Sequence, residues 1–267
     1  MYEAYWGLKV SPFDNAPDPA FFYNSPKHEE ALNRLLYVAR RQKGAAMLTG
    51  EIGCGKTLIV RLLMKELLQQ HYEIGLIVNP MLAPDELLRE ILHQLGLSAG
   101  EEGKGELIHR LNSMLVETDA RGHSTVLIID DAQDIQETRT FEELRLLLNM
   151  QLNNRFLLTL LLVGQPELEV KVTKLQQFEQ RIALKYHLDP LDFDETVHYI
   201  TTRLERAGTK RQVFTYDAIE KIYAMSGGIP RRINNICDLS LLVSYGMQAK
   251  EVDVNLVLEV IKDLKWH

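Results

Sequence analysis

The chain has 267 residues, a formal net charge of −7, and 46% hydrophobic against 25% charged residues. This is the composition of a globular protein, and the length allows one large domain or two smaller ones with ample core. No apolar run approaches the ~20 residues that a bilayer-spanning helix needs, and two cysteines imply no disulfide framework and suit a reducing cytoplasm.

The first elements are an arm and a helix. Residues 1–24 are rich in aromatic residues and prolines without a sustained period, which predicts an ordered arm. Ser25 and Pro26 then predict a helix start, because Ser caps the helix and Pro suits its first position.

A complete phosphate-binding loop follows a short apolar strand predicted over 45–49. Its residues are Gly50, Glu51, Ile52, Gly53, Cys54, Gly55, Lys56 and Thr57, and Leu58 continues the binding segment into an amphipathic helix. Glycines let successive backbone N–H groups turn inward around phosphates at the positive end of that helix. Lys56 is expected to reach the β- and γ-phosphates, and the Thr57 hydroxyl to hold Mg²⁺.

The elements after this loop predict an α/β fold and then a helical region. Strands are expected over 74–79, 125–129 and 156–163, with helical stripes between them, which indicates a parallel sheet covered by helices on both faces. From Leu191 onward the strand signals stop, and helices are predicted over 193–207, 216–226, 230–245 and 253–265. The expected domains are therefore 1–190, with the arm, and 191–267.

Two carboxylates end the apolar strand 125–129. Asp130 and Asp131 emerge at its carboxyl end, where ligands of open α/β sheets bind. Asp130 is expected to hold Mg²⁺ with Thr57, and Asp131 to orient or deprotonate an attacking water.

Three more polar residues are candidates for the same chemistry. Gln165 follows the strand 156–163 and would position the water or sense the γ-phosphate, although its sequence also suits a plain turn. Arg181 lies between a helical stretch predicted over 171–180 and a short strand predicted over 186–188, where it could face a neighbouring subunit. Arg231 begins a helix of the second domain and could approach the phosphates.

The order of these motifs resembles the AAA+ ATPases, and most closely the ExeA/GspA type of bacterial secretion and pilus assembly. The resemblance rests on the phosphate loop, Asp130-Asp131-Ala132-Gln133, Val163-Gly164-Gln165-Pro166, Gln180-Arg181-Ile182 and Gly228-Ile229-Pro230-Arg231. It implies that Gln165 is sensor 1, Arg181 an arginine finger, Arg231 sensor 2, and the helical region a lid. Walker B of the family usually reads Asp-Glu, so Asp131 is one methylene shorter than expected.

The resemblance implies an Mg²⁺-dependent ATPase that binds ATP and ADP, associates with copies of itself, and remodels a protein partner in an envelope secretion or pilus machine. The shorter carboxylate of Asp131 predicts that its turnover is slow. Two alternatives stay open, which are a DNA-linked regulator of the transposition type and a nucleotide-gated scaffold with little hydrolysis. The acidic charge favours a protein partner over DNA. The expected location is the cytoplasm, or the inner membrane by way of a partner or of a segment outside this chain.

Overall fold

The computed structural model describes residues 1–16, 18–98, 100, 102–152 and 155–264. These residues form two compact units. One comprises residues 27–50 and 59–188, and the other comprises 1–26, 51–58 and 189–267. In the described residues, no helix combines the length and hydrophobicity needed to cross a bilayer.

The first unit is built on a five-stranded, wholly parallel sheet in the order β2-β3-β6-β1-β7. The strands are β1 (Ala45–Gly50), β2 (Tyr72–Ile77), β3 (Ser124–Ile129), β6 (Leu158–Gly164) and β7 (Ile182–Leu188). All seven residues of β6 are buried, as expected for a central strand covered on both faces. The parallel sheet predicted from the apolar runs is confirmed.

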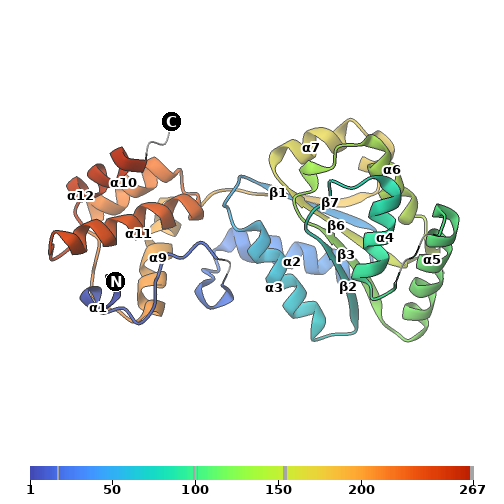
Figure 1. The fold of residues 1–267 in the computed structure, drawn as a ribbon, viewed down its shortest axis with the longest axis horizontal. Coiled ribbons are helices and arrows are strands. Elements are labelled where there is room, and N and C mark those ends of the chain that lie inside the picture. Colours follow the sequence, from blue (N-terminus) through green and yellow to red (C-terminus); the bar gives the residue numbers. More distant parts are fainter. Residues whose placement is uncertain (17, 99, 101, 153–154, 265–267) are drawn as a thin grey trace. The chain divides into compact units, whose positions relative to one another are not determined.

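Helices cover both faces of this sheet (Figure 1). The helices α2 (Pro26–Arg40) and α3 (Lys56–Leu68) lie on one side. On the other lie α4 (Pro84–Gln94) and α5 (Lys104–Ala120), and the unit is completed by α6 (Thr138–Leu147), α7 (Pro166–Thr173) and α8 (Gln176–Glu179). A core of buried Leu, Ile and Phe side chains joins α4 to α8 to alternate residues of the strands, because neighbouring residues of a strand point to opposite faces.

Several predicted boundaries in this unit are wrong. The second strand is Tyr72–Ile77 rather than 74–79, because Tyr72 and Glu73 pair with Ser124 and Thr125. The helix predicted over 171–180 is broken between α7 and α8, and β7 starts at Ile182 because its first residues pair with β1. Four short elements were not predicted, namely η2 (Ala132–Asp134), α6, β4 (Gln151–Leu152) and β5 (Arg155–Phe156).

The second unit holds four long helices, α9 (Phe193–Ala207), α10 (Tyr216–Ser226), α11 (Pro230–Gly246) and α12 (Val254–Leu264). These agree with the predicted ranges to within one residue, except that residue 265 lies outside the described residues. The N-terminus of α9 forms a reciprocal cap, since Asp192 Oδ1 accepts from the Glu195 N–H and Glu195 Oε2 from the Asp192 N–H.

The N-terminal arm packs on these helices through α1 (Glu3–Trp6) and η1 (Pro19–Phe21). Trp6 is buried, and its indole N–H donates to the Leu241 carbonyl at 3.1 Å. The buried guanidinium of Arg203 on α9 donates to the carbonyl oxygens of Pro12, at 2.5 Å, and Asp14, at 3.0 Å. The arm therefore shares its core with the helical region, whereas the domain boundary at residue 190 stays a prediction.

Candidate functional site

The phosphate-binding loop is a curled backbone that runs into the first turn of α3. Gly53 and Gly55 have φ values of +87° and +102°, in the region that favours glycine. Lys56 is the first residue of α3 and is buried, with its Nζ donating to the Glu51 carbonyl at 3.0 Å, while Thr57 is exposed. A glycine cradle before a helix N-terminus, with a lysine turned toward it, fits the phosphates of a nucleotide.

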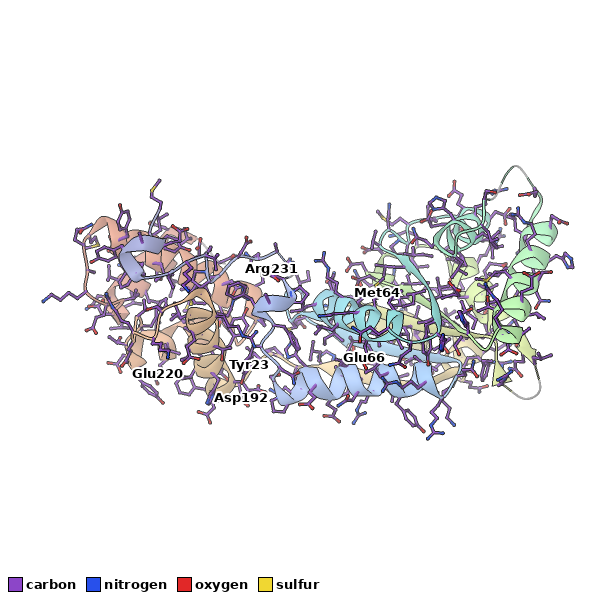
Figure 2. The ribbon with its side chains drawn as sticks, turned by 90° about the horizontal axis from the view of Figure 1, so that it is seen from below. Tyr23, Met64, Glu66, Asp192, Glu220 and Arg231 are labelled. Carbon is purple, nitrogen blue, oxygen red and sulfur yellow. The ribbon has the colours of Figure 1, made fainter. Side chains whose placement is uncertain are left out.

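Arg231 contacts the loop within the same unit. Its backbone N–H donates to the Gly53 carbonyl at 3.3 Å. A Cβ at Gly53 would lie 2.7 Å from the Cβ of Arg231 and 3.2 Å from Cγ2 of Ile229, so only glycine allows this approach. Pro230, at the first position of α11, favours the start of the helix here. The Arg231 side chain is labelled in Figure 2. Arg231, expected to approach the phosphates, thus lies against the loop backbone.

Cys54 lies inside the loop, where a reactive thiol would be conspicuous. Its side chain is buried, and this burial raises the pKa of the thiol to about 11, against a smaller lowering by the Lys56 charge. Little thiolate is then present near neutral pH, so Cys54 behaves as a small packing residue.

The carboxyl edge of the sheet gathers the other candidates. Thr49 of β1 pairs with Gly164 of β6, and Ile129 of β3 pairs with Leu162, so the residues that follow these strands share one edge. Asp130 is buried there, and its Oδ1 accepts the backbone N–H of Asp131 at 3.0 Å. Asp131 is exposed and has a left-handed backbone with φ of +50°, which Asp tolerates better than most residues. One buried and one exposed carboxylate therefore stand side by side.

Gln133 links the two polar strand ends, and the sequence interpretation gave it no role. Its Nε2 donates to Asp131 Oδ1 at 3.1 Å, and its Oε1 accepts the backbone N–H of Gln165 at 2.9 Å. A Cβ at Gly164 would lie only 2.6 Å from this Oε1, so glycine makes the contact possible. Gln133 therefore fixes Asp131 relative to Gln165 across strands β3 and β6. The signal that could have found it is a long amide two residues beyond a strand-ending carboxylate.

Gln165 occupies the N-cap position of α7, without a side-chain capping bond among the described residues. Its backbone is extended, Pro166 takes the first helical position, and its side chain is partly exposed. Lys171 of the same helix donates to the carbonyl oxygens of Gln133, at 2.6 Å, and Ile135, at 2.9 Å. The Gln165 backbone is thus held at the carboxyl edge, where Gln133 links it to Asp131, and the role of the Gln165 side chain stays a prediction.

Arg181 lies at the opposite edge of the sheet. It immediately precedes Ile182, which pairs with the first residue of β1, whereas Leu188 pairs with Gly50 at the carboxyl edge. Six residue steps at ~3.3 Å each separate the two edges by about 20 Å, which exceeds the reach of an arginine side chain. The guanidinium donates to Asn149 Oδ1 at 2.8 Å. Within its own unit, Arg181 therefore does not act with Asp130, Asp131 or Gln165.

The structure thus forms two groups of predicted residues. Glu51 to Leu58 lie with Arg231 in one unit, and Gly50, Asp130, Asp131 and Gln165 lie at one sheet edge of the other. Arg181 belongs to neither group. Within its own unit it lies at the end of the sheet opposite to the carboxyl edge.

Two comparisons with known sequences bear on identity. A family model described as AAA domain matches residues 39–172. General secretion pathway protein A of Aeromonas hydrophila is 36% identical over 255 residues, covering 94% of this chain and 46% of that protein. The chain therefore spans less than half the length of this relative. Both findings confirm the resemblance drawn from the motifs.

Solved structures share the fold. Cdc6p from Pyrobaculum aerophilum matches with a TM-score of 0.70 and 17% identity, over 92% of this chain and 69% of that one. The Aeropyrum pernix ORC2 protein, solved as ADPNP-ADP complexes, matches with a TM-score of 0.65 and 18% identity, over 92% and 71% of the two chains. These identities show the fold alone, a parallel sheet followed by a helical region. With its own α/β unit and phosphate loop, the chain belongs to the AAA domain family and is similar to General secretion pathway protein A.

Proposed function

We propose that the chain is an Mg²⁺-dependent ATPase and that its helical region, 191–267, is a lid. The conformation of this lid responds to the nucleotide that is bound. The hydrogen bond from the Arg231 N–H to the Gly53 carbonyl carries this proposal, because it ties the first turn of α11 directly to the phosphate loop. A conformational change of the loop on nucleotide binding then moves the backbone at the first turn of α11.

The roles of the binding residues follow from their chemistry. The N–H groups of the loop and the Lys56 ammonium bind the β- and γ-phosphates, and the Arg231 guanidinium adds a second cation beside the loop. The residues that suit Mg²⁺ are the Thr57 hydroxyl and the buried Asp130 carboxylate, since Mg²⁺ prefers oxygen ligands. When bound, the ion neutralises negative charge on the phosphate oxygens.

Asp131 is the proposed general base. It is exposed to water, and Gln133 donates to its Oδ1, which fixes one carboxylate oxygen. The Asp131 carboxylate orients the attacking water and takes its proton, and the Gln165 side chain holds that water from the next strand. Because Asp131 is one methylene shorter than Glu, the proposed turnover is slow.

We propose that Arg181 acts only when copies of the chain associate. About 20 Å of strand separates it from the carboxyl edge of its own sheet, which supports a role at the nucleotide of a neighbouring copy rather than at its own. A guanidinium that neutralises charge on a neighbour's phosphates makes hydrolysis depend on assembly.

The work done by the cycle is proposed to be assembly or remodelling of a protein complex in envelope secretion. The similarity to General secretion pathway protein A supports this role, as does the net charge of −7, which disfavours extended contact with DNA. The partner test is recovery of a defined set of envelope secretion proteins with ATP-loaded but not ADP-loaded chain. DNA binding whose affinity falls steeply with salt would favour the DNA-linked alternative.

The test of nucleotide binding is Lys56→Ala, with Lys65→Ala as a matched control on the same helix. Lys65 is exposed and lies more than two turns from the loop. Titration with a fluorescent ATP analogue should show at least a tenfold loss of affinity for Lys56→Ala and none for Lys65→Ala, with unchanged circular dichroism. Affinity within twofold of wild type for a folded Lys56→Ala would refute the phosphate-loop assignment.

A further inference from the structure

The helical unit contains a cavity of about 300 Å³ to which the proposed ATPase cycle assigns no role. It lies between α9, α10 and the segment 208–215 that joins them. Its apolar wall consists of Val197, Ile200, Leu204, Val213, Phe214 and Ile219. A volume near the lower end of the ~300–1,000 Å³ typical of ligand pockets suits one large apolar side chain rather than a whole cofactor.

The backbone of Val252 holds the connecting segment in place through two hydrogen bonds. The Val252 N–H donates to the Val213 carbonyl at 2.8 Å, and the Thr215 N–H donates to the Val252 carbonyl at 3.0 Å. Thr215 Oγ1 also caps α10 by accepting the Ala218 N–H at 3.3 Å. Because these bonds fix residues 213–215, this part of the cavity wall is preformed, and binding there would cost little ordering.

The mouth of the cavity is basic, although the chain as a whole is acidic. Lys210 and Arg211 line it, and both are exposed. The Arg211 guanidinium donates to the backbone carbonyl of Lys250 and lies over the Trp6 ring. Lys9 is exposed and packs against Gly208, with its Cγ 3.0 Å from the position of a Cβ there. Within the described residues, none of these four cations forms an ion pair.

Two carboxylates adjoin the four cations. Glu205 lines the cavity, and Glu251 follows Lys250 in the chain. The positive excess attracts carboxylates, while Glu205 disfavours a dense array of phosphates at the same mouth. Glu205 can instead accept backbone N–H groups, which a peptide has and which phosphodiesters and lipid headgroup phosphates lack.

We propose that this cavity, with the rim of Lys9, Lys210, Arg211 and Lys250, is a docking site for a short segment of a partner protein. That segment carries one large apolar side chain flanked by Asp or Glu. The apolar side chain fills the cavity between α9 and α10, and the flanking carboxylates pair with the basic rim. Docking here does not require ATP hydrolysis, so the proposal is separable from the proposed ATPase.

The test uses three pools of fluorescein-labelled heptapeptides and fluorescence anisotropy with the full chain. The first pool has a central Phe, Leu, Ile, Met or Trp flanked by Asp and Glu. The second keeps the centre and has Lys and Arg flanks, and the third keeps the acidic flanks and has Ser at the centre. The first pool should bind at least tenfold more tightly than either of the others.

Two variants should abolish this preference by different routes. Lys210→Glu with Arg211→Glu reverses the rim charge, and Thr201→Trp fills the cavity from the exposed face of α9, where Thr201 lines it. Each should lower affinity for the first pool at least tenfold. The control, Lys43→Glu with Lys65→Glu, makes the same charge change at exposed positions in the other unit and should bind as wild type does. An unchanged melting temperature and unchanged ATP-analogue affinity show that the variants are folded.

Three outcomes would overturn the proposal. Equal binding of the Ser-centred pool would mean charge attraction alone, and an equal loss in the control would mean a general charge effect. The third outcome is that the wild-type chain shows no preference among the peptide pools. If the rim variant then loses self-association, the site binds a second copy. If it loses binding to vesicles with 30% phosphatidylglycerol, the site binds a membrane. None of these outcomes bears on Lys56, so failure here and failure of the ATPase proposal are distinguishable.

Discussion

The backbone N–H of Arg231 donates to the carbonyl oxygen of Gly53, with 3.3 Å between the two atoms. The contact depends on the absence of a side chain at Gly53, since a Cβ there would approach Arg231 Cβ to 2.7 Å. Two residues separated by 178 positions in sequence are therefore in direct backbone contact within one compact unit.

Gly53→Ala should weaken nucleotide binding at least tenfold, because the loop must move away from α11 and the residue must also hold φ near +87°. The measurement is titration with a fluorescent ATP analogue. Gly105→Ala is the control, because Gly105 lies within α5 with nothing near an added Cβ, and alanine there should stabilise by about 1 kcal/mol. Wild-type affinity in Gly53→Ala would show that the loop does not depend on its contact with Arg231.

Asp131 should control the chemical step and leave ATP binding intact. Asp131→Asn keeps an oxygen that can accept from Gln133 but removes the base, so the single-turnover rate should fall about 100-fold or more. Asp131→Glu should be faster than wild type, because misplacement by about 1 Å can cost on the order of 100-fold in rate. Rapid-quench measurements on the three proteins decide this. A Glu variant slower than Asp would mean that the site, with its left-handed backbone at 131, is built around the shorter side chain.

Arg181→Ala should leave nucleotide binding unchanged but remove the part of hydrolysis that rises with protein concentration. Mixing Arg181→Ala with Asp131→Asn should restore activity, because one copy supplies the guanidinium and the other the intact site. Arg181→Lys should not substitute, since an ammonium cannot make the bidentate contact. If hydrolysis did not depend on protein concentration and mixing gave no rescue, Arg181 would have only a structural role through its hydrogen bond to Asn149.

Arg203 should be the strongest anchor of the arm. Arg203→Ala removes the donor to the Pro12 carbonyl and the bond to the Tyr199 hydroxyl, and leaves the Asp14 carbonyl with only the 3.4 Å bond from Asn234 Nδ2, so it should cost about 3 kcal/mol of stability. Arg206→Ala also removes two bonds to arm carbonyls, at Ala20 and Phe22, but from an exposed side chain, and should cost under about 1 kcal/mol.

The measurement for both variants is urea unfolding followed by Trp6 fluorescence in a Trp266→Phe background, which leaves Trp6 as the remaining tryptophan. Trp6 reports on the arm because it is buried against α11. Equal losses for Arg203→Ala and Arg206→Ala would contradict the argument that burial of the guanidinium decides its contribution.

Local sequence determined the features whose physics is local. Glycines before Lys56 and Thr57 specify the phosphate loop, and buried apolar runs specify β1, β3 and β6 because a central parallel strand must be apolar on both faces. The periodic helices α9, α10 and α11 were predicted almost to the residue, since their Pro, Asp and Gly boundaries are set by neighbouring residues.

Long-range pairing decided the rest. β7 acquires its first residues only by pairing with β1, and this register places Arg181 at the edge away from Asp131, which spacing along the chain does not reveal. The role of Gln133 depends on the close approach of β3 and β6 at Gly164, and the Arg231 contact on the approach of α11 to Gly53. Such contacts join residues far apart in sequence, and they form only once whole elements have packed.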